Sequence, residues 1–183
     1  MRGKKAVFLA VLVLVFLSAG INVIAQEQTA SCPANQTILT LSSLTNAHGA
    51  LWNDSKYPIK ICYNEIFGRN YTFVQNENIR ACSANSQNLV LKLDGLGNAH
   101  AKAPPLGDVN DNHIKICYGD LSCVATTSAC TSDKKFAVSL SDAKNAHLSK
   151  TNSYKYNLCC NSTRAVGAVC GNGIYPEGAE GCD

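Results

Sequence analysis

The most regular feature of the chain is an alternation of apolar and polar positions that recurs three times, each time before an Asn-Ala-His tripeptide. The residues five, seven and nine places before the asparagine are Leu41, Leu39 and Thr37, then Leu93, Leu91 and Leu89, then Leu140, Val138 and Phe136. A period of two puts each set on one face of a strand. The other face carries Thr40 and Ser42, Lys92 and Asp94, and Ser139 and Ser141. We therefore expect half-buried strands in antiparallel sheets with one wet side.

A second alternating segment follows each tripeptide. Its apolar rows are Ile59, Ile61 and Tyr63, then Ile114, Ile116 and Tyr118, then Tyr156, Leu158 and Cys160. A cysteine recurs between the last two members of each row, and it faces the opposite way. Gly, Asn, Ser and Asp interrupt every apolar run, which favours short strands joined by turns.

The recurrence divides the chain into three copies. We assign them to residues 26–80, 81–129 and 130–165, followed by a short tail at 166–183. A fixed self-similarity of roughly fifty residues is typical of a tandem array. The predicted fold is all-β, with disulfide-stapled, sandwich-like antiparallel repeats behind an N-terminal signal helix.

The N-terminus has the pattern of a secretory signal peptide. Arg2, Lys4 and Lys5 precede an unbroken apolar run at residues 6–17, and small residues place the expected cleavage after Ala25. The alternative is an uncleaved membrane anchor over residues 6–24. Removal of the signal leaves 16 − 3 = 13 basic against 13 acidic residues. Without a basic stripe, nucleic acid is not an expected partner.

All ten cysteines lie after the signal, which predicts a disulfide framework outside the cytosol. They contain no C-x-x-C pair, so their spacing does not predict structural zinc. The scheme we prefer closes each repeat on itself through Cys32–Cys62, Cys82–Cys117 and Cys130–Cys159, and leaves Cys123, Cys160, Cys170 and Cys182 for two further bridges. A competing scheme staples neighbours, for example Cys62–Cys82 and Cys117–Cys130, and spacing does not decide between them.

The vicinal pair Cys159-Cys160 carries a separate prediction. The two side chains point to opposite faces of one strand, so we expect them to begin two separate bridges. Four asparagines stand in glycosylation motifs that suit an exported glycoprotein: Asn35, Asn53, Asn70 and Asn161.

The three repeated histidines, His48, His100 and His147, allow two interpretations. Three imidazoles would suit zinc or copper if the repeats met around a pseudo-threefold axis, whereas a linear array would hold them apart. Alternatively, Asn-Ala-His is a structural turn, since asparagine accepts left-handed conformations. We favour the turn and predict no metal and no cofactor. G-x-S-x-G and H-E-x-x-H motifs are absent, so we predict no catalytic residue and no enzyme activity.

Two stretches resemble known surface-protein modules. Residues 41–48, Leu-Ser-Ser-Leu-Thr-Asn-Ala-His, with Tyr57 and Lys60-Ile61-Cys62, resemble a cysteine-rich repeat of secreted surface proteins from small-genome (DPANN-type) archaea. This resemblance covers most of the mature chain and implies no activity. Residues 170–183, with Cys170-Gly171-Asn172-Gly173 and Cys182-Asp183, resemble the opening of a C-G-N-G…C-D surface repeat. That repeat normally continues, so we expect a truncated piece of a longer surface protein.

We therefore expect an archaeal cell-surface or extracellular structural or adhesion module, whose partner is an envelope or extracellular protein or glycan surface. Membrane contact would involve only an uncleaved signal segment. The expected binding surface lies in the loops after each tripeptide, at residues 50–56 with Trp52 and at 101–112. The alternative is a secreted ligand-binding or inhibitor protein.

Overall fold

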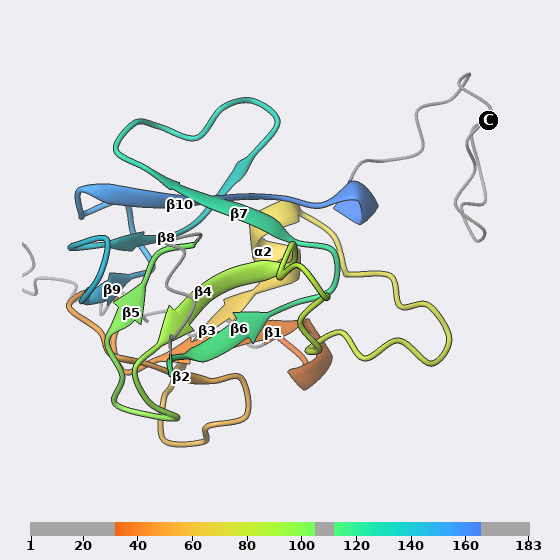
Figure 1. Ribbon diagram of the computed structural model, residues 1–183, viewed down its shortest axis with the longest axis horizontal. Coiled ribbons are helices and arrows are strands. Elements are labelled where there is room, and N and C mark those ends of the chain that lie inside the picture. Colours follow the sequence, from red (N-terminus) through yellow and green to blue (C-terminus); the bar gives the residue numbers. More distant parts are fainter. Residues whose placement is uncertain (1–31, 105–111, 166–183) are drawn as a thin grey trace, which may run out of the picture.

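The computed structural model describes residues 32–104 and 112–165, which form three antiparallel sheets (Figure 1). The strands are β1 (Thr37–Leu41), β2 (Gly49–Leu51), β3 (Ile59–Cys62), β4 (Leu89–Leu93), β5 (Ala101–Lys102), β6 (Ile114–Cys117), β7 (Ser122–Thr126), β8 (Lys135–Leu140), β9 (Leu148–Ser149) and β10 (Tyr156–Asn161). Short helical segments are η1 (Ala34–Gln36), α2 (Tyr63–Phe67) and η2 (Thr163–Ala165). The predicted β-rich, disulfide-bonded class is confirmed. Sandwich-like packing stays a prediction, and the signal helix lies outside the described residues.

Each repeat builds the same three-stranded unit. The strand before the tripeptide lies in the centre, a short strand that begins just after the histidine pairs with one edge, and the second predicted strand pairs with the other. The orders are β2-β1-β3, β5-β4-β6 and β9-β8-β10. One strand departs from our boundaries: β7 falls in the range assigned to the second repeat but pairs with β10 of the third.

A β-bulge occurs at the same place in all three units. Between the central strand and its second partner, the register skips one residue at Ile38, at Val90 and at Ala137. An extra residue in one strand breaks the period of two and increases the local twist. Ile38 and Val90, which strict alternation puts on the polar face, therefore belong to the buried core.

The expectation of one wet face was wrong within the central strands, although Ser42, Asp94 and Ser141 just after them are half-exposed or exposed. All five residues of β1 and of β4 are buried, and the polar face contributes Thr40 at 1 %, Lys92 at 6 % and Ser139 at 0 % exposure. The hydroxyls are satisfied internally, since Thr40 donates to the Leu51 carbonyl and Ser139 to the Thr151 carbonyl. These acceptors lie at the end of β2 and two residues after β9, and a strand pattern alone does not reveal them.

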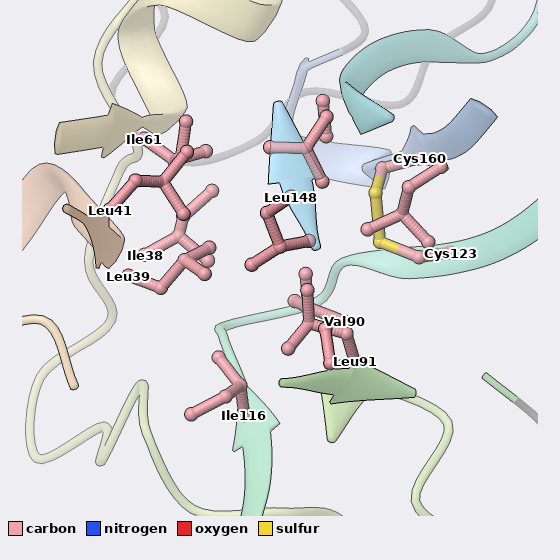
Figure 2. Packing of buried hydrophobic residues seen from close by; sticks show 14 of the residues in the cluster. Ile38, Leu39, Leu41, Ile61, Val90, Leu91, Ile116, Cys123, Leu148 and Cys160 are labelled. Atoms are coloured by element: carbon pink, nitrogen blue, oxygen red, sulfur yellow. A yellow bond between two sulfur atoms is a disulfide. The ribbon is translucent and has the colours of Figure 1, made fainter. Parts of the chain in front are cut away.

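The three units share one hydrophobic core instead of standing as separate domains. Leu41, Leu93 and Leu140, one from each central strand, are fully buried in a single cluster. Figure 2 shows Leu148 of the third repeat between side chains of the first and second repeats. Units of about fifty residues bury too little surface to be stable alone, and a common core removes that difficulty.

Four disulfides lie within the described residues. Cys32–Cys62, Cys82–Cys117 and Cys130–Cys159 close the repeats on themselves, as in our preferred scheme, and the neighbour-stapling scheme is wrong. The fourth joins Cys123 of β7 to Cys160 of β10, so the vicinal cysteines do begin separate bridges. Cys170 and Cys182 lie outside the described residues. By chain entropy, each loop of about thirty residues contributes roughly 3–4 kcal/mol.

The tripeptides close the three units into a ring. The residue before each histidine pairs antiparallel with the residue after the histidine of a neighbouring repeat, which gives the pairs Ala47–Leu148, Ala99–Gly49 and Ala146–Ala101. Each pair exchanges two backbone hydrogen bonds, and the six N···O distances are 2.8–3.1 Å. Every repeat therefore contacts both others around a pseudo-threefold axis, and the array is closed, not linear.

We predict that Gly49→Ala lowers the free energy of unfolding by about 1–3 kcal/mol, because an added methyl group overfills a packed core. A Cβ at Gly49 would lie 2.8 Å from a Leu93 methyl and 3.1 Å from a Leu148 methyl, and both leucines are fully buried. The matched control is Gly95→Ala, whose Cβ would meet its nearest atom at 3.6 Å. Denaturant unfolding without reductant measures both variants; equal effects would contradict the crowding argument.

Candidate functional site

The three repeated histidines meet on the outer side of this ring. In an extended backbone, successive side chains point to opposite sides. Ala47 and Gly49 are buried, and so are Ala99 and Ala101 and their third-repeat counterparts Ala146 and Leu148. Each histidine lies between two inward-facing residues and is directed away from the core, half-exposed. The alanine of the motif is small because it lies at the centre of the ring, where the three chains approach most closely.

A repeated side-chain contact fixes the backbone of each histidine. The residue six places earlier is Ser42, Asp94 or Ser141, and its side-chain oxygen accepts the histidine N–H at 2.9–3.0 Å. Its own N–H donates back to the histidine carbonyl at 3.0–3.1 Å in every copy. Ser42, Asp94 and Ser141 are the last residues of the polar face that the sequence predicted. All three carry a side-chain oxygen six residues before the histidine, and this recurrence was the sequence signal for the contact. The imidazoles are therefore held by a rigid frame.

The imidazole rings lie close together. Their centroids are 4.9 Å apart for His48 and His100, 4.9 Å for His48 and His147, and 4.7 Å for His100 and His147. One ring nitrogen from each residue can be chosen so that all three lie within 4.8 Å of one another. The structure thus brings together the group of residues that metal coordination requires, although we had favoured a purely structural turn.

A neighbouring asparagine orients one of these rings. The Nδ1 atom of His100 is 2.5 Å from the Oδ1 atom of Asn145, which belongs to the tripeptide of the next repeat. An amide oxygen only accepts hydrogen bonds, so Nδ1 of His100 is the donor in this contact, and Nε2 is the ring nitrogen that remains for another partner. By the same ring pairing, Asn98 occupies the corresponding position beside His48, and Asn46 the one beside His147.

The other two rings lie in different environments. Burial, followed by the nearby His100 and His147, lowers the pKa of His48 below its usual value. At neutral pH His48 is therefore unprotonated, as a metal ligand must be. The Nδ1 atom of His147 is buried and has no hydrogen-bond partner. An unsatisfied buried nitrogen of this kind is costly and calls for an explanation.

The turn interpretation accounts for part of the motif. Asn46 and Asn98 have φ angles of 52° and 51°, in the left-handed region that asparagine tolerates. Tyr154 and Tyr57 donate hydrogen bonds to their side-chain oxygens at 3.4 and 3.5 Å. The turn therefore explains why asparagine occurs at this position in two copies. It does not explain why the residue two places later, which points away from the core, is a histidine in all three copies.

Trp52, the other predicted binding residue, lies apart from the histidines. It is half-exposed, with the guanidinium of Arg80 4.1 Å from its ring centroid. Arg80 also donates to the Ala34 and Thr37 carbonyls, both at 2.8 Å. Burial lowers the pKa of Arg80 to about 10, so this residue remains charged at neutral pH. The tryptophan is thus held by a cation–π contact at the edge of the fold.

The predicted glycosylation sites differ in accessibility. Asn35, Asn53 and Asn70 are exposed, while Asn161 is half-buried and its Oδ1 atom has no hydrogen-bond partner. Of the predicted binding loop at 101–112, residues 101 and 102 form strand β5 and pair with β4, and most of the remainder lies outside the described residues.

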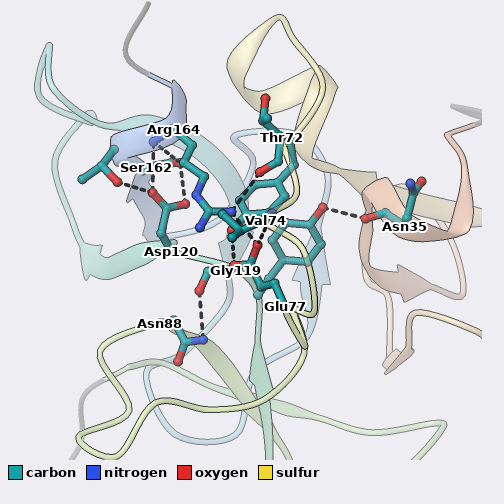
Figure 3. A network of polar contacts seen from close by, with 12 residues as sticks. Asn35, Thr72, Val74, Glu77, Asn88, Gly119, Asp120, Ser162 and Arg164 are labelled. Atoms are coloured by element: carbon teal, nitrogen blue, oxygen red, sulfur yellow. Dashed lines mark hydrogen bonds and ion pairs between the residues drawn. The ribbon is translucent and has the colours of Figure 1, made fainter. Parts of the chain in front are cut away.

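A polar network links the end of β10 to the segments before it (Figure 3). Asp120 accepts hydrogen bonds from Ser162, Thr163 and the Arg164 N–H, and the Arg164 guanidinium pairs with Glu77 at 2.6 Å. An open depression of about 490 Å³ lies beside it and is lined by Ser83, Gln87, Asn88, Gly119, Asp120 and Ser122. Its main polar groups are already engaged, since Asn88 donates to the Ala81 and Gly119 carbonyls. We interpret these contacts as a structural network, called the Asp120–Glu77 network below, that fastens the chain after β10 to earlier segments.

The two carboxylates of the Asp120–Glu77 network predict that the fold becomes less stable in acid. Burial alone would raise the pKa of Glu77, but the hydrogen bonds from Arg164, the Val74 N–H and Tyr71 hold it below its ordinary value. Burial would likewise raise the pKa of Asp120, but hydrogen bonds from the Ser162 and Thr163 hydroxyls lower it below its ordinary value. A carboxyl with a depressed folded-state pKa stabilises the fold above its unfolded pKa and loses that contribution as the pH falls through the folded value.

We therefore expect Glu77→Gln to be less stable than the unmodified chain at pH 7 by about 1–2 kcal/mol, since hydrogen bonds to a charged group are lost. The difference should shrink as the pH falls below about 4.5, the ordinary glutamate value. Urea unfolding from pH 7 to pH 2.5 measures it. Glu65→Gln is the control and should cost less, because it removes an ion pair to Lys150 from a more exposed carboxylate, with 39 % side-chain exposure against 20 % for Glu77. A Glu77→Gln deficit that stays constant with pH would contradict the prediction.

No helix within residues 32–104 and 112–165 is both long enough and apolar enough to cross a membrane. The chain matches no protein-family model, no curated protein and no solved structure. The geometry of its own residues therefore carries the functional argument.

Proposed function

We propose that this chain is an exported, non-catalytic structural or adhesion module of a cell surface or of the extracellular space. The observation that carries this proposal is the combination of a closed three-repeat ring with four disulfides, each of which has at least one buried cysteine. Cys62, Cys117, Cys159 and Cys160 are each at most 3 % exposed. Such a framework forms and persists in oxidising compartments.

The N-terminal pattern supports the same location. A basic start, an apolar run and small residues before Gln26 suit export with cleavage after Ala25. The exposed Asn35, Asn53 and Asn70 would be accessible to a glycosylation system there. The resemblance to archaeal surface repeats favours retention at the cell envelope.

The surface that we propose for adhesion lies around Trp52. The ring is half-exposed at the end of β2, and Arg80 fixes one side of it. A rigid aromatic residue loses little entropy on binding and often contributes a large share of an interface's affinity. An envelope or extracellular protein or glycan would be the partner.

Export and oxidation are tested by expressing the full chain with its own N-terminus and analysing it by non-reducing peptide mass spectrometry. We expect a mature chain that begins at Gln26 and carries the four described bridges, recovered with the cell envelope. A reduced chain in the cytosol would contradict the proposal. A soluble monomer in the medium would favour the alternative, a secreted ligand-binding or inhibitor protein.

Adhesion is tested by measuring binding of the purified mature chain to isolated envelopes. We expect Trp52→Ala to weaken binding by about tenfold or more, as for an aromatic anchor. Phe73→Ala removes an aromatic side chain that is 40 % exposed elsewhere on the surface and should leave binding nearly unchanged. Equal effects of the two substitutions would argue against a surface centred on Trp52. Circular dichroism checks that both variants fold.

A further inference from the structure

We propose that His48, His100 and His147 together bind one late first-row divalent metal ion, zinc or copper, at the junction of the three repeats. The residues come from three copies separated in sequence by about fifty residues, and ring closure brings their side-chain nitrogens within 4.8 Å of one another. The proposal is independent of export or adhesion, because it concerns only the folded ring.

The donor set selects the class of metal. Three neutral imidazoles suit Zn²⁺, Cu²⁺ and Ni²⁺, whereas Mg²⁺ and Ca²⁺ require oxygen ligands. The half-exposed rings leave one side of the cluster open to solvent. A water molecule can therefore complete a four-coordinate site on that side, the arrangement typical of zinc sites with three protein ligands.

The distances require only a local adjustment. Ligand nitrogens about 2.0–2.1 Å from a tetrahedral zinc ion lie about 3.4 Å from one another. The upper limit of 4.8 Å in the structure is larger. Turning the imidazoles toward the axis closes this gap, and the backbone need not move, because the Ser42, Asp94 and Ser141 contacts hold it.

One observation besides the proximity of the three rings indicates a ligand rather than a merely packed cluster. His100 donates a hydrogen bond from Nδ1 to Asn145, and metal-binding histidines typically hold their other ring nitrogen in a contact of this kind, which fixes the orientation of the ring. Asn46 and Asn98 occupy the corresponding positions beside His147 and His48.

The experiment measures metal binding by the purified mature chain after dialysis against EDTA. Calorimetric titration with ZnCl₂, CuCl₂, NiCl₂, CoCl₂, MgCl₂ and CaCl₂, with metal content checked by mass spectrometry, gives stoichiometry and affinity. We expect one ion per chain, tightest for Cu²⁺, weaker for Zn²⁺, Ni²⁺ and Co²⁺, and no binding of Mg²⁺ or Ca²⁺. The Co²⁺ complex should show the intense visible absorption of a low-symmetry, four-coordinate site.

Histidine variants locate the site. His48→Gln, His100→Gln and His147→Gln should each lower Zn²⁺ affinity by about a hundredfold or more, because one of three protein ligands is lost. The matched control is His113→Gln, at the one histidine of the chain outside the cluster, which should leave affinity within about twofold. Thermal unfolding without metal checks that each variant folds.

Asn145 is predicted to be a positioning residue for the metal. Asn145→Ala should lower Zn²⁺ affinity by about 10- to 100-fold while the stoichiometry stays at one, since losing the hydrogen bond that orients a ligand histidine typically has an effect of this size. Asn152→Ala, at an exposed asparagine that is not part of a tripeptide, is the control. The Co²⁺ spectrum should shift in Asn145→Ala only.

The wild-type titration decides the proposal even if variants fail to fold. Absence of one-to-one binding of Zn²⁺, Cu²⁺, Ni²⁺ and Co²⁺ by the folded chain would overturn it. Binding that survives in all three folded histidine variants, or that His113→Gln removes, would overturn it as well. Neither result would affect the proposed export or adhesion, which are measured without added metal.

Discussion

The architecture depends on the closure of three Asn-Ala-His segments into a ring of backbone hydrogen bonds. The six bonds join every repeat to both others, at N···O distances of 2.8–3.1 Å. A linear array leaves its terminal units with one uncovered face, whereas a ring of three leaves none. The closure turns three small units into one body with a common core, and each disulfide then restrains a segment of that body. The ring also positions the histidines, because its alternation sends the small residues inward and the imidazoles outward.

The local structure could be predicted from the sequence, since register and bridge partners depend on short-range spacing. The central strands and the second strands follow from counting residues to the tripeptide and to the recurring cysteine, whereas the self-closing bridges were one of two schemes that the spacing left open. The wet face was predicted incorrectly because two effects are non-local. The bulges at Ile38, Val90 and Ala137 change the register of the strands. The hydroxyls of Thr40 and Ser139 are bonded to carbonyls at the end of β2 and just after β9, which lie ten or more residues away in the sequence.

The sequence could not decide whether the three histidines lie together, for a related reason. Periodicity tells which face a residue occupies, but not whether copies stack in a row or close into a circle. The sequence therefore left the three imidazoles either far apart or together, and only the pairing of Ala47, Ala99 and Ala146 with neighbouring repeats decides the question. The alanine itself was the overlooked signal, because a small residue repeated beside an outward side chain suits close approach of backbones at an axis.

Comparison of the three copies separates what the fold needs from what the site needs. After the histidine, the inward position is Gly49, Ala101 or Leu148, and the large side chain of Leu148 packs where Gly49 leaves room. After the recurring cysteine, Tyr63 and Tyr118 correspond to Cys160, which fills the position with a disulfide instead. Packed positions thus vary among copies, because neighbours compensate for differences in volume. The histidine is identical in all three copies although it is half-exposed and the turn does not require it. Packing compensation cannot explain that identity, but the metal site that we propose would, since three imidazoles held in equivalent frames would each supply one ligand nitrogen.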